Sequence, residues 1–226
     1  MSDFWTGMEP TTESPYYPYR KVVDADTLAG AEQIPYILCR YLMDLPDGKG
    51  YEPPSDNKFP RARLKKLLYW DGPMPLTQPL PTAEQMREIF FDPENPDRPP
   101  DATRRYRVFP QNTVQQSLAD SRSLIRVYLS DARLVEMRGQ FITRQDVIFD
   151  VIVNVGIESN TGMTASSRSY DIVQCIKEAV SGVNFGGIGP MVVRMITKID
   201  DERYNLGYKI YAHIDWCSDA PNPYFA

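Results

Sequence analysis

Proline is distributed unevenly along this chain of 226 residues, and that asymmetry limits what each half can fold into. Seventeen of the 20 prolines precede residue 120, and only Pro190, Pro221 and Pro223 follow it. Proline fixes the backbone φ angle and removes a hydrogen-bond donor, so it interrupts helices and central strands. The first half is therefore predicted to contain short elements. The second half is predicted to be a compact domain of longer strands and a helix.

The charge balance argues against a dedicated nucleic-acid-binding protein. The chain has 25 Lys and Arg residues against 30 Asp and Glu, a net charge of −5, and neither half is basic. Such a surface repels nucleic-acid phosphate, yet it suits a protein that DNA slides past without sticking. We recognise no signal peptide, and no apolar run approaches the ~18 residues that span a bilayer. We therefore expect a protein made in the cytoplasm, with no membrane partner.

Three short helices are predicted in the first half, near residues 34–42, 61–69 and 82–91. Apolar residues recur at helical spacing in each, and the third begins with a capping box of Thr82 and Gln85. Isolated helices of about ten residues or fewer are marginally stable, so these must dock on something larger. Alternating arginines and apolar residues at 104–109 predict a short strand.

Two other segments of the first half bear on partners. Residues 10–19 combine three prolines with Tyr16, Tyr17 and Tyr19. Extended backbone is expected there, and such an arm could lie along a neighbouring surface or fold onto its own domain. The basic cluster at 61–66 could contact phosphate, but we interpret a charge run this short as a solvated helix face.

The second half is predicted to form an antiparallel sheet with one helix packed on a face. Strands are expected at 122–129, 145–156, 191–199 and 206–216, and residues 134–142 either extend the first strand or form a hairpin arm. Ser166 and Ser167 can cap the helix between the second and third strands, and Gly182 ends it. The order β-β-α-β-β, preceded by the proline-rich half with its short helices and long loops, predicts the α+β class.

No catalytic, cofactor-binding or metal-binding motif is recognised. His213, the only histidine, lies near Asp215, but a nucleophile elbow such as GxSxG is absent. The glycine-rich loop 184–189 follows a helix and precedes a strand, whereas phosphate-binding loops lead from a strand into a helix. The three cysteines are too scattered for a zinc site or a disulfide framework, which predicts buried free thiols. We therefore expect no cofactor and no enzymatic activity.

Four segments of the second half resemble the tail terminator proteins of tailed bacteriophages. They are the strand 147–155, the helix start Ser167-Arg168-Ser169-Tyr170-Asp171-Ile172, the turn 183–189 and the last strand 208–216. In that family a small antiparallel sheet flanked by helices forms a hexameric ring, which caps the tail tube and joins it to the neck.

The resemblance implies a virion structural protein in the tail or neck. Its partners would be further copies of itself, the tail tube protein and the head–tail connector or neck proteins. DNA would pass through the lumen without specific binding. Two alternatives stay open: a head-completion or connector protein of the neck, and a small nucleic-acid- or ligand-binding enzyme that uses residues 61–66, residues 104–107, or His213 with Asp215.

These patterns divide the chain into four predicted parts. They are an extended arm at 1–30, short helices and loops docked on the core at 31–119, a tail-terminator-like α+β domain at 120–217, and a C-terminal tail at 218–226. Subunit and partner contacts are expected from the exposed faces of two strands, the loop 159–166 and the arm. The residues predicted to make them are Gln145, Asp150, Asn154, Lys209, Tyr211, His213, Asp215, Tyr16, Tyr17 and Tyr19.

Overall fold

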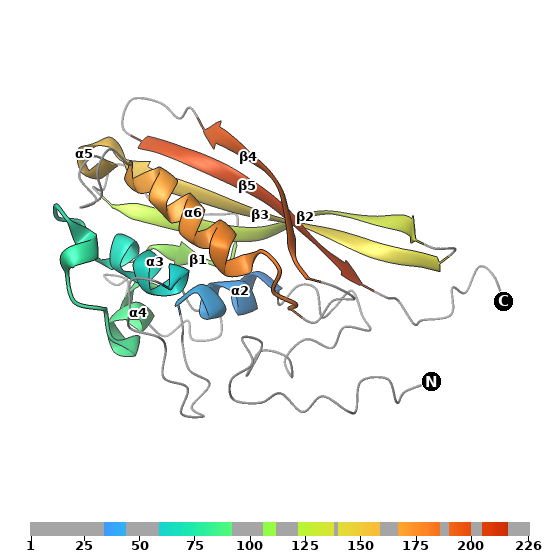
Figure 1. The fold of residues 1–226 in the computed structure, drawn as a ribbon, viewed down its shortest axis with the longest axis horizontal. Coiled ribbons are helices and arrows are strands. Elements are labelled where there is room, and N and C mark those ends of the chain that lie inside the picture. The colour runs from blue at the N-terminus through green and yellow to red at the C-terminus, as the bar shows by residue number, and fades with distance from the viewer. Residues whose placement is uncertain are drawn as a thin grey trace.

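A computed structural model of the chain (Figure 1) describes residues 34–43, 59–91, 106–111, 122–137, 140–158, 167–185, 190–199 and 205–216. The arm with Tyr16, Tyr17 and Tyr19, the loop 159–166 and the tail 218–226 lie outside these residues. The helices are α2 (Ile34–Met43), α3 (Pro60–Tyr69), α4 (Ala83–Ile89), α5 (Val155–Glu158) and α6 (Arg168–Val180), with a 3₁₀ turn η2 (Pro75–Thr77). The strands are β1 (Val108–Phe109), β2 (Ser123–Met137), β3 (Gln140–Asn154), β4 (Val192–Ile199) and β5 (Asn205–Trp216).

The five strands form one sheet in the order β1-β2-β3-β5-β4. The four long strands pair antiparallel with their neighbours, and β1 pairs parallel with β2. Because α6 lies between β3 and β4 in the chain, the predicted β-β-α-β-β order and the α+β class are confirmed. The short strand expected near residues 104–109 is also present: it is β1, which adds a parallel edge to the sheet.

β2 and β3 form one long hairpin, which decides between the two interpretations of residues 134–142. The register runs from Ser123 opposite Val153 to Met137 opposite Gln140, so the segment spans both arms of the hairpin. A register shift between Leu129 and Ala132 marks a bulge in β2. Beyond that bulge the hairpin reaches past the helices (Figure 1). We call its outer part, residues 130–137 of β2 and 140–144 of β3, the hairpin arm.

The helices α2, α3 and α6 lie on one side of the sheet (Figure 1). α6 contacts β3 and β5, α2 contacts β2, and α3 packs mainly on α6. Tyr41 of α2 also donates a hydrogen bond from its hydroxyl to the carbonyl of Ala179 in α6, at 3.1 Å. Helices of the proline-rich half are therefore stabilised by packing against the sheet and the long helix, since helices of this length are marginal alone.

Local sequence signals set the helix ends as predicted. The Ser167 hydroxyl accepts a hydrogen bond from the backbone N–H of Tyr170 at the start of α6, and Gly182 follows that helix with a φ of 81°. Both bonds of the capping box are present at α4. The Thr82 N–H donates to the Gln85 side chain at 2.9 Å, and the Gln85 N–H donates to the Thr82 hydroxyl at 3.2 Å. These bonds satisfy backbone groups that a helix end leaves unpaired.

The main hydrophobic core lies between the helices and the sheet. Its largest contributions from β3 and α6 are Val147, Phe149, Val151, Val153, Ile172, Val173, Ile176 and Val180, all essentially fully buried. The period-two alternation thus marks the inward face of β3 correctly from Val147 to Val153. The strand expected to reach residue 156 ends at Asn154, and Val155, which is 48% exposed, begins α5. Cys39 and Cys175 lie in this core as free thiols, so the prediction of buried free thiols is confirmed for both, and burial raises the pKa of Cys175 to about 12. Cys217 lies outside the described residues.

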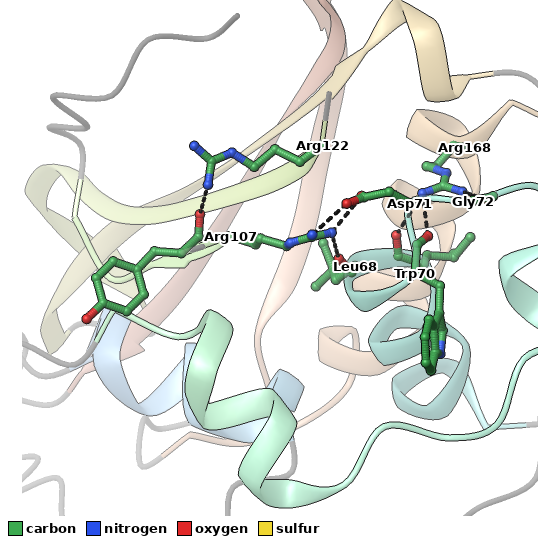
Figure 2. A network of polar contacts seen from close by, with 9 residues as sticks. Leu68, Trp70, Asp71, Gly72, Arg107, Arg122 and Arg168 are labelled. Carbon is green, nitrogen blue, oxygen red and sulfur yellow. Dashed lines mark hydrogen bonds and ion pairs between the residues drawn. The ribbon is translucent and has the colours of Figure 1, made fainter. Parts of the chain in front are cut away.

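A polar clamp joins the two halves of the chain, as Figure 2 shows. Arg107, next to β1, donates from both Nη atoms to the Asp71 carboxylate at 2.6 Å. Arg168, the almost fully buried first residue of α6, donates to the carbonyls of Trp70 at 2.8 Å and Gly72 at 3.0 Å. These carbonyls directly follow α3, where helix carbonyls lack internal partners. The polar clamp of Asp71, Arg107 and Arg168 therefore fixes the end of α3 to the start of α6.

Candidate assembly surface

Most of the predicted contact residues that the structure describes lie on the second face of the sheet, opposite the helices. Strand register sets side chains in rows across this face, and one row is charged: Arg126 of β2, Asp150 of β3 and Lys209 of β5. The Asp150 carboxylate is only 2% exposed and lies 2.8 Å from Arg126 Nη2 and 3.6 Å from Lys209 Nζ. It also accepts a hydrogen bond from the Tyr128 hydroxyl at 3.2 Å. This row therefore links three strands through one carboxylate whose negative charge is balanced by two cationic side chains.

A second charged pair bridges β3 and β5 nearer the hairpin arm. Arg144 lies directly opposite Asp215 and donates from Nε and Nη2 to its two carboxylate oxygens, at 2.6 and 2.7 Å. These bonds hold the pKa of Asp215 below its usual range. His213 Nε2 is 3.9 Å from Asp215 Oδ1, beyond hydrogen-bond distance. Burial, then the positive charges of Arg194 and Arg144, lower the pKa of His213, which keeps the imidazole neutral near pH 7.

Apolar rows alternate with the charged ones on this face. One row crosses four strands and contains Tyr128, Ile148, Tyr211 and Met195. At the β1 end of the face, a small cluster of Tyr106, Phe109, Leu124 and Ile152 packs with Phe91. The rings of Phe91 and Phe109 stack with centroids 5.9 Å apart. The second face is thus a mixed surface with its own hydrophobic cluster.

The strand face predicted to be exposed is largely buried, which corrects the expectation for four residues. Gln145, Asp150, Asn154 and His213 are each less than a tenth exposed. The Gln145 amide donates to the carbonyl of Ser130 at 3.2 Å, beside the β2 bulge, and Asn154 accepts from the N–H of Gly156 at 2.8 Å. Gln145, Asp150 and Asn154 are thus buried with partners from their own chain, whereas Nδ1 of the buried His213 has no hydrogen-bond partner within the described residues. Lys209, Tyr211 and Asp215 are half-buried, and their role as contacts stays a prediction.

The basic cluster of α3 is also held inside the protein. Lys65 and Lys66 are 1% and 8% exposed, and Lys66 Nζ donates to the carbonyl of Leu76 at 3.2 Å. Arg61 stacks over the ring of Tyr41, and Arg63 pairs with Glu178 of α6 at 2.5 Å. The interpretation of this segment as a solvated face was wrong, because α3 packs its basic side chains onto neighbouring elements. The cluster does not form a free patch for phosphate.

The two outer edges of the sheet carry exposed apolar residues that sequence reasoning did not single out. On β4, at one edge, Val192 and Met195 are 43% and 50% exposed. On the hairpin arm of β2, near the other edge, Leu134 is 68% exposed. Alternation in the sequence locates these strands but does not say which of them end the sheet, so the order of strands was the missing signal.

The described residues contain no group of three His, Cys, Asp or Glu side chains placed to hold a metal ion. None of the described helices has both the length and the apolar character needed to cross a membrane.

Comparison with known proteins relates the chain to phages. No curated protein matches the sequence significantly. The sequence matches the family YomW over residues 62–214, which run from α3 to near the end of β5 and include the polar clamp, β1 to β4 and most of β5. The match covers more than half of the chain and begins well before residue 120. The chain therefore belongs to the YomW family, a family of phage-derived proteins.

Proposed function

We propose that this chain is a structural protein of a tailed-phage virion that forms a ring at the head-proximal end of the tail. The ring would be a homohexamer that caps the tail tube and joins it to the neck, as tail terminator proteins do. Membership of a phage-derived family supports a phage role. The observation that carries the assembly role is the helix-backed sheet with exposed residues on β4 at one edge and on β2 beyond β1 at the other, because sheet edges are surfaces for pairing between chains.

A structural role, and not an enzymatic one, fits the polar residues of the second face. Asp150 is paired with Arg126 and Lys209, and Asp215 is paired with Arg144. These carboxylates link neighbouring strands of the sheet. The proposed partners are further copies of the chain, the tail tube protein and the neck proteins, and the site of action is the virion after synthesis in the host cytoplasm.

DNA would pass through the ring without specific binding. The net charge of −5 and the packing of the α3 basic residues against their own chain support this part of the proposal. A salt-dependent, tight association of the purified chain with DNA would contradict it and would favour the nucleic-acid-binding alternative.

The test is to locate the chain in particles and to remove it. In a phage that encodes this chain, an antibody or tag label is expected at the junction of head and tail in electron micrographs. A null mutant is expected to accumulate separate heads and tails. Label at another site, or virions that join normally without the chain, would refute the proposal.

Extract complementation separates a tail terminator from a head-completion protein. Heads and tails from the null mutant are purified and each is mixed with its wild-type counterpart. A tail terminator predicts that mutant heads join wild-type tails, whereas mutant tails join wild-type heads only after the purified chain is added. The reverse pattern would place the chain on the head side of the neck.

A further inference from the structure

β4 ends the sheet at one side. Among the described strands it pairs only with β5, so the backbone groups on its outer side face away from the sheet. Val192 and Met195 are exposed along this strand. Burial of large apolar side chains like these against a partner is favourable. Its charged residues, Arg194 and Lys198, are both basic.

β2 offers a second edge on the opposite side of the same sheet. β1 pairs with it only at Ile125 and Arg126, and within the described residues no strand pairs with the outer side of β2 beyond that point. This edge includes the exposed Leu134. It also carries two acidic residues, Asp131 and Glu136, and one basic residue, Arg133, which pairs with Asp146 of β3 at 3.4 Å.

We propose that β4 of one copy pairs with the outer part of β2 of the next copy, so that the sheet continues from subunit to subunit. β2 and β5 run in one direction, and β3 and β4 run in the other, because each long strand is antiparallel to its neighbour. A second copy placed beside the first in the same orientation therefore brings β2 antiparallel to β4, the arrangement of every other long pair in the sheet.

Length, charge and apolar character match between the two edges. β4 has eight residues, and the outer part of β2 extends from Val127 to Met137. The basic β4 would face an edge on which acidic residues are in excess, and cross-strand pairs of opposite charge stabilise a sheet. Pairing would also remove Met195 and Leu134 from water. The two edges differ from each other, so the contact is head-to-tail, and a contact of that kind gives a ring when the rotation from copy to copy closes.

This inference rests on the proposed ring-forming function and names the surface that forms the ring. The experiment uses the full-length chain, with its mass measured by light scattering after size-exclusion chromatography over a concentration series. Met195→Lys blocks the β4 edge and Leu134→Lys blocks the β2 edge, because lysine is a residue with which natural edge strands prevent pairing. Phe59→Lys, at an exposed position before α3, is the matched control.

Each single edge variant is expected to lose the oligomer and elute as a monomer, whereas the wild type and Phe59→Lys assemble. An equimolar mixture of Met195→Lys and Leu134→Lys is expected to form a dimer and nothing larger. In that mixture only one intact β4 meets one intact β2, and the other two edges both carry lysine. Circular dichroism and thermal melting check that the variants are folded, since both positions are exposed.

Several outcomes would overturn the inference. They are a monomeric wild type at every concentration, oligomers that persist in both edge variants, loss of assembly in only one of them, or a mixture that does not give a dimer. The label and null-mutant tests of the proposed function remain separate. If the chain lies at the head–tail junction but the edge variants still assemble, the inference about the edges fails and the proposed function stands. If the edges pair but the chain is absent from the virion, the proposed function fails and the inference about the edges stands.

Discussion

Replacing Arg168 with methionine tests whether the polar clamp holds the short helices to the rest of the protein. Arg168 is 1% exposed, and its guanidinium donates to the carbonyls of Trp70 and Gly72 at 2.8 and 3.0 Å. Methionine keeps much of the side-chain volume but donates no hydrogen bond. The substitution therefore removes these donors from the carbonyls of the half-buried Trp70 and the exposed Gly72 (Figure 2).

The expected loss follows from two opposing effects. Hydrogen bonds from a charged donor contribute about 1.5–3 kcal/mol each, so two of them give roughly 3–6 kcal/mol. Burial of the guanidinium opposes this, and it lowers the pKa of Arg168 even though Asp71 lies nearby and acts in the other direction. We expect a net loss of about 2–4 kcal/mol in the free energy of unfolding, a large part of the ~5–15 kcal/mol typical of a domain.

Urea denaturation measures this loss, and hydrogen exchange locates it. With a slope of about 3 kcal/mol per molar urea, the midpoint should fall by roughly 1 M. In Arg168→Met, the hydrogen-exchange rates of the α3 amides should rise above their wild-type values more than those of the β3 and β5 amides do. Arg87→Met, the same change at an exposed position of α4, should stay within about 0.5 kcal/mol of the wild type. A loss below about 1 kcal/mol for Arg168→Met would refute the clamp as a stabilising contact.

Three further predictions concern the sheet, a helix cap and pH. Gly207→Ala should lower stability by about 1–3 kcal/mol in urea titrations, because the new Cβ would lie 2.2 Å from the carbonyl oxygen of Val151. Gly72→Ala should be tolerated, because a Cβ atom at Gly72 would have no other atom within 4 Å. Thr82→Ala should cost about 1 kcal/mol in the same assay, through loss of the capping box; an unchanged midpoint would count against the cap. The pKa of His213 in the folded protein lies below its unfolded value of about 6.5. The neutral imidazole therefore contributes to the free energy of unfolding above about pH 6.5, and this contribution is lost as pH falls. His213→Gln should therefore lose less stability than the wild type between about pH 7 and pH 5; parallel pH profiles would contradict this.

Much of the fold could be predicted because the signals are local. Alternation at period two marks the inward residues of β3, and the capping serine and Gly182 mark the ends of α6. The hairpin arm could not be decided, since alternating residues at 134–142 suit one long strand as well as two paired ones. Only the register of β2 against β3 distinguishes them.

The surface was harder to predict because burial of a polar residue depends on distant partners. An aspartate such as Asp150 on one face of a strand indicates that this face is solvated. Nothing near Asp150 in the sequence indicates that Arg126 and Lys209 lie beside it in the sheet. The polar clamp was missed for the same reason. Arg168 lies about a hundred residues from the carbonyls it binds, and a lone arginine at a helix start carries no pattern.

The proline asymmetry bears directly on which edge of the sheet stays open. β1 joins the sheet beside β2 but pairs with only two of its residues, and Pro110 follows β1 immediately. Proline has no backbone N–H and cannot donate to a ladder, so a longer β1 is disfavoured at that position. The outer side of β2 is left without β1 from Val127 onward, and this is the edge on which the proposed subunit contact depends. Within the part of the chain that the structure describes, Pro110 therefore limits how far β1 can cover β2, and this leaves the longer β2 edge for the proposed contact with another copy of the chain.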